Sequence, residues 1–159
     1  MTIKVYTDGG SRNTGNVKGG SVQPTDKAAW AYLIVSKDLN LQLSDSQGQL
    51  GATNNQMEIT AVLMALRALY KKNLQEEHIL LVSDSQYVLN SIQQWLPGWK
   101  KNGWKNASKK EVKNKDLWIQ IDKALPYFPN LTFEWTKGHA QDAGNNFVDE
   151  LLNRTMDAM

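Results

Sequence analysis

The sequence has no cysteine among its 159 residues. This excludes disulfide bonds, thiolate metal sites and a cysteine nucleophile. It is compatible with the reducing cytoplasm, which is where we expect the protein to act. No apolar run approaches the roughly 20 residues that cross a bilayer, and the N-terminus lacks the apolar core of a secretory signal. We therefore expect no membrane partner.

Internal repeats, low-complexity tracts and flexible linkers are also missing, and the chain has only 4 prolines. A chain of this length buries roughly 70% of the surface that it exposes when unfolded, which suffices for one core. We therefore expect a single domain over residues 1–159. No long apolar surface stripe is left over, so we expect a monomer.

Acidic residues are scarce in one segment, from Trp95 to Lys115. It holds one acid, Glu111, against seven lysines, a net charge of +6; because the whole chain carries +2, the remaining residues sum to −4. Three tryptophans lie among these lysines, in the stretch WLPGWKKNGWKNASKK. This asymmetry predicts an anionic partner that docks at one place on an otherwise acidic protein.

The hydrophobic pattern predicts an α/β domain around a mixed sheet. A helix with an asparagine cap is expected over 53–72. A second helix is expected to carry Val88, Ile92, Trp95 and Leu96 on its apolar face and to end near Pro97. A short helix before Pro126 and a last one around 148–152 follow. The expected strands cover residues 3–8, 28–36, 39–45, 78–83 and 131–136.

Four carboxylates stand near the ends of these elements, and each has a purely structural explanation. Asp8 precedes two glycines and suits a turn. Glu58 lies three residues after Asn55, where the acid of a capping box belongs. Asp84 could cap the helix that follows it, and Asp149 could favour the dipole of the last helix.

Taken together, the four carboxylates indicate more than caps and turns. Asp8 and Asp84 both follow predicted strands, at the edge of an open α/β sheet where ligands bind. The helices that carry Glu58 and Asp149 could close around the same point. Converging carboxylates repel one another unless cations neutralise them, and oxygen ligands suit Mg²⁺ or Mn²⁺. Two such ions about 4 Å apart would clamp the attacking and leaving oxygens of a phosphodiester.

The ordered motifs of the chain resemble type 1 ribonuclease H of the bacterial kind. They are TDGG (7–10), TNNQMEI (53–59), SDSQYV (83–88), KGH (137–139), VDELLN (148–153) and, for the basic protrusion at about 95–115, QWLPGWKKNGWKNASKKEVKNKDLW (94–118). The resemblance implies a ribonuclease H-like fold, a five-stranded mixed sheet flanked by helices. It also implies an endonuclease that cuts the RNA strand of an RNA–DNA hybrid with two Mg²⁺ ions, for which Mn²⁺ can substitute.

Roles for single residues follow from the same resemblance. Asp8 would bridge both ions, and Glu58 and Asp84 would hold the ion that faces the leaving 3′ oxygen. Asp149 would share with Asp8 the ion that activates the attacking water, leaving a 5′ phosphate. His139 matches the family histidine that shuttles protons or aids product release; its structural alternative is a surface histidine with satisfied hydrogen bonds.

Substrate contacts transfer in the same way. The positions expected to face the hybrid are Gly9, Gly10, Asn13 or Asn16, Thr53, Asn54, Gln86, Trp95, Trp99, Lys100, Lys101, Trp104 and Lys105. A protein distinguishes RNA from DNA by the 2′-OH, which both donates and accepts hydrogen bonds. Amide side chains and backbone groups can serve either role.

The match departs from the family at three places. The loop after the first strand is longer and lacks a GNPG-like turn, so Asn13 and Asn16 remain alternatives for one substrate contact. Gln56 stands where arginine is frequent, and Gly98 where asparagine is frequent. Both bear on a pocket for a phosphate of the DNA strand, in which Thr53 is expected to have fewer partners.

The tryptophan–lysine segment has several interpretations. A membrane-surface helix would need an unbroken amphipathic period, which a proline and two glycines interrupt. Burial explains Trp95 alone, which we expect to be mainly structural, and a solvated charge run explains only the lysines. A nucleic-acid contact explains both, with lysines on phosphates while Trp99 and Trp104 pack and hold the loop.

Two other functions stay open beside the hybrid endonuclease. One is a hybrid-binding module whose catalytic site has decayed, although all four carboxylates are retained. The other is a different nucleic-acid substrate on the same architecture, as in junction resolvases and transposases.

Overall fold

The computed structural model describes residues 2–12, 22–137 and 142–159. Its strands form one mixed sheet in the order β3-β2-β1-β4-β5. β1, β2 and β3 pair antiparallel, whereas β1, β4 and β5 pair parallel. The strands are β1 (Thr2–Ser11), β2 (Lys27–Ser36), β3 (Leu41–Leu50), β4 (His78–Ser83) and β5 (Leu131–Trp135).

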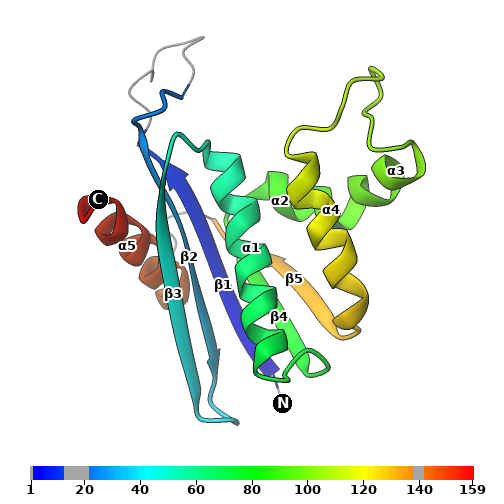
Figure 1. The fold of residues 1–159 in the computed structure, drawn as a ribbon. Coiled ribbons are helices and arrows are strands. Elements are labelled where there is room, and N and C mark those ends of the chain that lie inside the picture. The colour runs from blue at the N-terminus through cyan, green and yellow to red at the C-terminus, as the bar shows by residue number, and fades with distance from the viewer. Residues whose placement is uncertain (1, 13–21, 138–141) are drawn as a thin grey trace.

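Helices cover both faces of this sheet (Figure 1). One face carries α1 and, beside it, α2, α3 and α4, whereas α5 packs on the other face against β1, β2 and β3. The helices are α1 (Asn54–Lys71), α2 (Gln86–Asn90), the π-helix η1 (Ser91–Trp95), α3 (Leu96–Lys101), α4 (Lys115–Ala124), the 3-10 helix η2 (Leu125–Tyr127) and α5 (Ala143–Asp157). The predicted α/β class and the order of the elements are confirmed.

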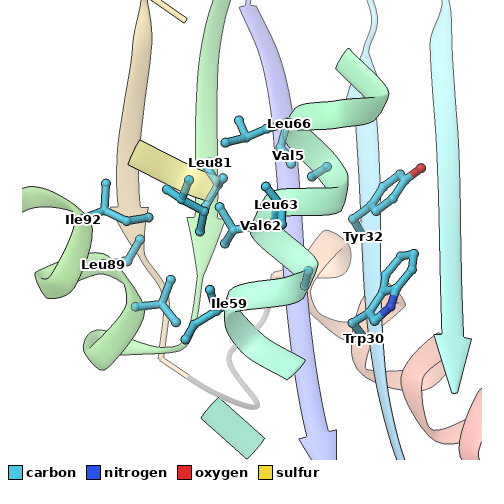
Figure 2. Packing of buried hydrophobic residues seen from close by; sticks show 14 of the residues in the cluster. Val5, Trp30, Tyr32, Ile59, Val62, Leu63, Leu66, Leu81, Leu89 and Ile92 are labelled. Carbon is cyan, nitrogen blue, oxygen red and sulfur yellow. The ribbon is translucent and has the colours of Figure 1, made fainter. Parts of the chain in front are cut away.

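The core is divided by the sheet into two layers. On the α1 face, Val62 and Leu63 of α1 lie among Val5 of β1 and Leu81 of β4 (Figure 2). A smaller cluster on the other face consists of Tyr6, Val82, Val148, Leu152 and Met156 with Leu33 and two alanines of β2, Ala29 and Ala31. Because β1 is covered on both sides, its residues from Val5 to Gly9 are all buried, which fixes this central strand firmly.

The first strand is longer than the sequence predicts. β1 does not end at Asp8 but continues to Ser11, because its antiparallel pairing with β2 runs on to Ser11 opposite Ala28. Its parallel pairing with β4 ends at Thr7 opposite Ser83. Asp8 therefore lies inside a strand, and the turn-former explanation for it is wrong. The third strand also exceeds its predicted end at residue 45 and reaches Leu50.

The helix after β4 continues past the point where Pro97 was expected to end it. Between α2 and α3 the helix widens into η1, in which the Leu96 N–H donates to the carbonyl of Ser91, five residues back. A π turn of this kind leaves room for a proline, which lacks the N–H and would crowd a regular turn. The extra residue also rotates Trp95 off the buried face, so it is 44% exposed.

The caps of α1 and α2 are not the predicted residues, and α5 also has a cap. Thr53, rather than an asparagine, caps α1 in a capping box with Gln56. Ser85 caps α2, and Asp142 caps α5. Glu58, Asp84 and Asp149 are therefore not needed as caps, and Asp149 lies well inside α5, beyond the reach of a dipole effect at its first turn.

Within the described residues, no helix is both long and apolar enough to span a bilayer.

The contact between β1 and α1 depends on Gly9. A β-carbon at this position would overlap the backbone of Met57 and Glu58, whereas one at Gly98 in α3 would meet no atom within 4 Å. Only a residue without a side chain lets the strand and the helix approach this closely.

We expect Gly9→Ala to lower the free energy of unfolding by about 1–3 kcal/mol, because α1 must move away from β1. Gly98→Ala is the control, and it should raise stability by roughly 0.5 kcal/mol because it sits in a helix with open space around it. Urea denaturation in EDTA measures both. Similar midpoints for the two variants would contradict the close contact.

Candidate active site

Three carboxylates from three different elements meet at the carboxyl edge of β4. Asp8 of β1, Glu58 of α1 and Asp84, directly after β4, each place an oxygen so that all three lie within 4.8 Å of one another. Asp8 is 5% exposed, and Glu58 and Asp84 are half-buried. The sequence motifs that hold them are 26 to 76 residues apart, and the sheet register brings them together.

The register explains the position of Asp84. Thr7 and Ser83 are the last parallel partners of β1 and β4, so the next residue on each strand is a carboxylate. Asp8 stays in the sheet through its pairing with Ala31 of β2, whereas the chain bends away at Asp84 towards α2.

Gly9 brings the third carboxylate in. Because it has no side chain, the backbone of α1 at Met57 and Glu58 lies against β1. The Gly9 N–H donates to Asp8 Oδ1 at 2.9 Å, and a hydrogen bond from the same amide lowers the pKa of Glu58 somewhat. One backbone amide thus stabilises negative charge on two carboxylates.

Burial and mutual repulsion outweigh this stabilisation. Burial, followed by the charges of Asp84 and Asp149, raises the pKa of Asp8 to about 8. Burial and the charges of Asp8 and Asp84 raise the pKa of Glu58 well above its ordinary value. Without a cation the cluster therefore holds protons at neutral pH.

Asp149 approaches the cluster from the other face of the sheet. It lies on α5, and a hydrogen bond between its carboxyl and that of Asp8 adds to the raised pKa of Asp8. It is outside the group of three that lies within 4.8 Å. Asp8 is accordingly the member that faces both Asp149 and the Glu58–Asp84 pair.

The donor set fits divalent cations. All ligand atoms are carboxylate oxygens, which suit hard ions such as Mg²⁺ and Mn²⁺. Glu58 Oε2 is buried and has no hydrogen-bond partner in the described part of the chain, which is costly for a carboxylate unless a cation satisfies it.

The predicted substrate contacts nearest the cluster lie at the ends of β1, α1 and α2. Asn54 Oδ1 accepts from the Ser11 N–H at 2.6 Å, which ties α1 to the end of β1. Thr53 has its hydroxyl engaged by the Gln56 N–H at 3.1 Å, and Gln86 is exposed in the first turn of α2. Gln56 thus serves as the capping partner of Thr53.

The basic segment forms an ordered projection beside α4 (Figure 1). Helix α3 ends at Lys101, Gly103 follows two residues later with φ +70°, and the chain returns through a bridge between Lys105 and Glu111. The Trp104 N–H donates to the Trp99 carbonyl at 2.6 Å, and the Trp104 carbonyl accepts from Val112 at 3.0 Å. These bonds present the lysines on a fixed loop.

The three tryptophans of this segment differ in burial. Trp99 and Trp104 are half-buried, and Trp99 packs against Trp118 with ring centroids 5.9 Å apart. Trp95, which we expected to be mainly structural, is the exposed member and stacks obliquely on Tyr87 and Trp99. The burial expected for Trp95 is therefore wrong, whereas its role, structural or in substrate contact, stays a prediction.

The lysines of the segment are exposed except Lys115, which is half-buried, and they are not equivalent. Lys100 forms an ion pair with Asp122 of α4 at 3.3 Å, whereas Lys101 and Lys105 are exposed side chains of α3 and the loop. A groove runs from this segment to the first turn of α1, lined among others by Gln56, Lys113 and Asn114. It leads from the lysines towards the helix that carries Glu58.

Some expectations fall outside the described residues, and one contact was missed. His139, Asn13 and Asn16 lie in the ranges 138–141 and 13–21 and stay predictions. The contact missing from the predicted site is that of Trp135, whose indole N–H donates to the carbonyl of Asp84 at 3.2 Å. Its place at the end of a strand beside an active-site motif is the signal that could have drawn attention to it.

The RNase H family model matches residues 1–157. A protein of Hydrogenovibrio crunogenus named Ribonuclease H is 41% identical over 158 residues, which cover 99% of this chain and 97% of that protein. A Ribonuclease H of Francisella philomiragia is 38% identical and is matched over 90% of its length by 97% of this chain.

Solved structures agree in fold. A foamy viral protease-reverse transcriptase, in complex with dsDNA, aligns with a TM-score of 0.79 at 25% identity, covering 99% of this chain and 95% of that one. RNase H1 of the archaeon Halobacterium salinarum aligns over the full length of both chains with a TM-score of 0.69 at 23% identity.

The raised pKa values predict an unusual dependence of stability on pH. Between the ordinary pKa of 3.8 and about 8, folded Asp8 holds a proton that the unfolded chain has released. Its contribution to stability is therefore complete below pH 4 and is lost as the pH rises towards 8. In EDTA we expect the urea midpoint to fall from pH 5.5 to 8, and Mg²⁺ to restore it at pH 8.

Asp8→Asn is the control for this dependence, because it removes the titrating group and should flatten the slope. A midpoint that rises over the same range in EDTA would contradict the electrostatic description of the cluster.

Proposed function

Because the chain belongs to the ribonuclease H family, it is a hydrolase that cuts the RNA strand of RNA–DNA hybrids, and we propose that Asp8, Glu58, Asp84 and Asp149 perform this cleavage. The observation that carries the assignment is the group of three carboxylates within 4.8 Å, with a fourth hydrogen-bonded to its central member.

In this proposal the four carboxylates hold two divalent cations, Mg²⁺ in the first place, with Mn²⁺ as a substitute. Glu58 and Asp84 would hold one, Asp149 the other, and Asp8 both. Once bound, the cations lower the pKa of the attacking water and stabilise the charge on the leaving 3′ oxygen. The products carry a 5′ phosphate and a 3′ hydroxyl.

The chain's own groups prepare this site. The Gly9 N–H holds Asp8 Oδ1 in place, and the β1–α1 contact keeps Glu58 beside it. Both carboxyls favour protonation without a cation, so cation binding and proton release are linked. Such linkage makes cleavage depend steeply on pH and on cation concentration. His139 is proposed to take part in proton transfer or product release.

Recognition of RNA is assigned to polar groups beside the cluster. Gly9, Gly10, Asn54 and Gln86 stand at the ends of β1, α1 and α2 and offer backbone and amide groups for the 2′-OH. Since Asn54 Oδ1 is engaged by the Ser11 N–H, its amide N–H₂ is the group left to donate to substrate. Thr53, and Asn13 or Asn16, are proposed as further contacts.

The basic segment is proposed to hold the DNA strand. Lys100, Lys101 and Lys105 neutralise phosphates, and the indoles of Trp95, Trp99 and Trp104 support or contact the backbone. The groove between residues 111–117 and the first turn of α1 supports a path from this segment to the helix that carries Glu58. Because phosphate contacts carry no sequence information, cleavage should show little sequence preference.

We further propose that the protein acts as a monomer in the cytoplasm, as one domain. The lack of cysteine agrees with a reducing compartment. Light scattering on the protein as it elutes from a size-exclusion column measures its mass. A monomer gives a mass near 17.9 kDa, and an oligomer gives a multiple of that value.

A decayed, binding-only protein is the alternative. It predicts binding of hybrid without turnover. Retention of a repulsive, cation-fitting cluster argues against it, because such a cluster costs stability that a binding module need not sacrifice.

Purified protein with Mg²⁺ should cut the RNA of a labelled hybrid and leave duplex DNA, duplex RNA and single strands intact. Asp84→Asn should abolish cleavage and leave the cation-free protein as stable or more stable, because one repulsive charge is removed. Gel assays and urea denaturation measure the two effects. Equal cutting of duplex DNA would refute the 2′-OH recognition, and a large loss of stability would favour a structural role for Asp84.

Replacing Lys100, Lys101 and Lys105 together with alanine should raise KM, leave kcat nearly unchanged and flatten the dependence of binding on salt. The effect of Lys100 should be the smallest, because Asp122 already pairs with it. Lys37, Lys71 and Lys123, exposed lysines outside the segment, form a control of equal charge when replaced together. If kcat collapses at unchanged KM, the segment has been assigned the wrong role.

A further inference from the structure

Asp84 differs from the other two members of the carboxylate cluster in its backbone setting. Asp8 sits inside a strand and Glu58 inside a helix, where backbone hydrogen bonds on both sides fix them. Asp84 lies in the bend between β4 and α2. An oxygen of its carboxylate lies within 4.8 Å of oxygens of Asp8 and Glu58, and negative charges this close repel one another. Some contact must hold this bend against that repulsion.

The peptides around Asp84 are fixed one after another. The Ser83 carbonyl accepts from the Thr136 N–H at 2.9 Å, which closes the β4–β5 ladder. The Ser85 N–H donates to Ser83 Oγ at 3.0 Å, and Ser85 Oγ caps α2. Between them, the carbonyl of Asp84 itself accepts from the indole N–H of Trp135 at 3.2 Å.

Trp135 is not required by the core. It ends β5 and is 46% exposed, whereas Leu131 and Phe133, on the same side of that strand, are partly buried against the α1-side core. A large aromatic side chain at an edge strand gains little from burial there. The last backbone hydrogen bond between the two strands joins Thr136 to Ser83. The indole N–H of Trp135 adds one more hydrogen bond, to the carbonyl of Asp84, the next residue.

We propose that Trp135 is a positioning residue that holds the Asp84 peptide so that its carboxylate stays with Asp8 and Glu58. It does not touch the reacting atoms in this proposal but acts through Asp84. The inference rests on the proposed function only in that Asp84 is taken as a ligand of divalent cations.

The test measures cation binding directly, without substrate. Trp135→Phe keeps an aromatic ring and removes the donor, and we expect its affinity for Mn²⁺ by calorimetry to fall about five-fold, as for the loss of one net hydrogen bond. In cleavage assays the Mg²⁺ concentration at half-maximal rate should rise by a similar factor. The KM for hybrid and the rate at saturating Mg²⁺ should stay within two-fold of the unmodified protein.

A purely structural role predicts a different pattern, in which the thermal midpoint falls and activity drops at every Mg²⁺ concentration. Should Trp135→Phe fail to fold, 3-benzothienylalanine at position 135 keeps the shape of the indole and lacks only its N–H. Tyr127→Phe is the control, because Tyr127 is another exposed aromatic, packed at Tyr70 away from the cluster.

The outcomes separate the two claims. Mn²⁺ affinity within two-fold of the unmodified protein overturns the positioning role, whether or not the protein cleaves hybrid. The variant can also lose Mn²⁺ affinity while the unmodified protein fails to cleave hybrid. That result upholds the positioning role and overturns the proposed function.

Discussion

Electrostatic repulsion among Asp8, Glu58 and Asp84 is the constraint that the contacts at the centre of this fold must overcome. Their oxygens lie within 4.8 Å of one another, and burial raises the free energy of the charges on Asp8 and Glu58. The surrounding structure holds them by rigid means: a strand buried on both faces, a helix that contacts it at Gly9, and a bend tied to β5. Together these contacts keep the carboxylates close to one another in spite of their repulsion.

The residues next to the carboxylates perform the ordinary structural tasks. Thr53 with Gln56 caps α1, Ser85 caps α2 and Asp142 caps α5. The carboxylates are thereby left without a capping role, although each stands where a cap or a turn would be plausible. Taken one at a time, the positions of the four carboxylates therefore fit caps and turns. Only the four residues taken together indicate a shared site.

Cutting and holding are assigned to separate parts of the molecule. The cluster is acidic and lies at the sheet edge, whereas the lysines stand on a projection that α3, the Lys105–Glu111 bridge and the packing of Trp99 on Trp118 keep in shape. The lysine side chains of the projection are thereby kept away from the carboxylates. Ion pairs between lysines and these carboxylates would neutralise the cluster in place of a metal ion. A groove lined by Gln56 and Asn114 lies between the end of the basic segment and the first turn of α1.

The sequence by itself determined the α/β class, the order of the elements, the four carboxylates and the basic segment, because hydrophobic period and residue type are local properties. Tertiary structure decided the rest. Pairing with β2 carries β1 past Asp8, and a π turn carries a helix through Pro97 and exposes Trp95. The meeting of Asp8, Glu58 and Asp84, and the bond from Trp135 to Asp84, depend on strand register and on contacts between distant segments, which no local pattern contains.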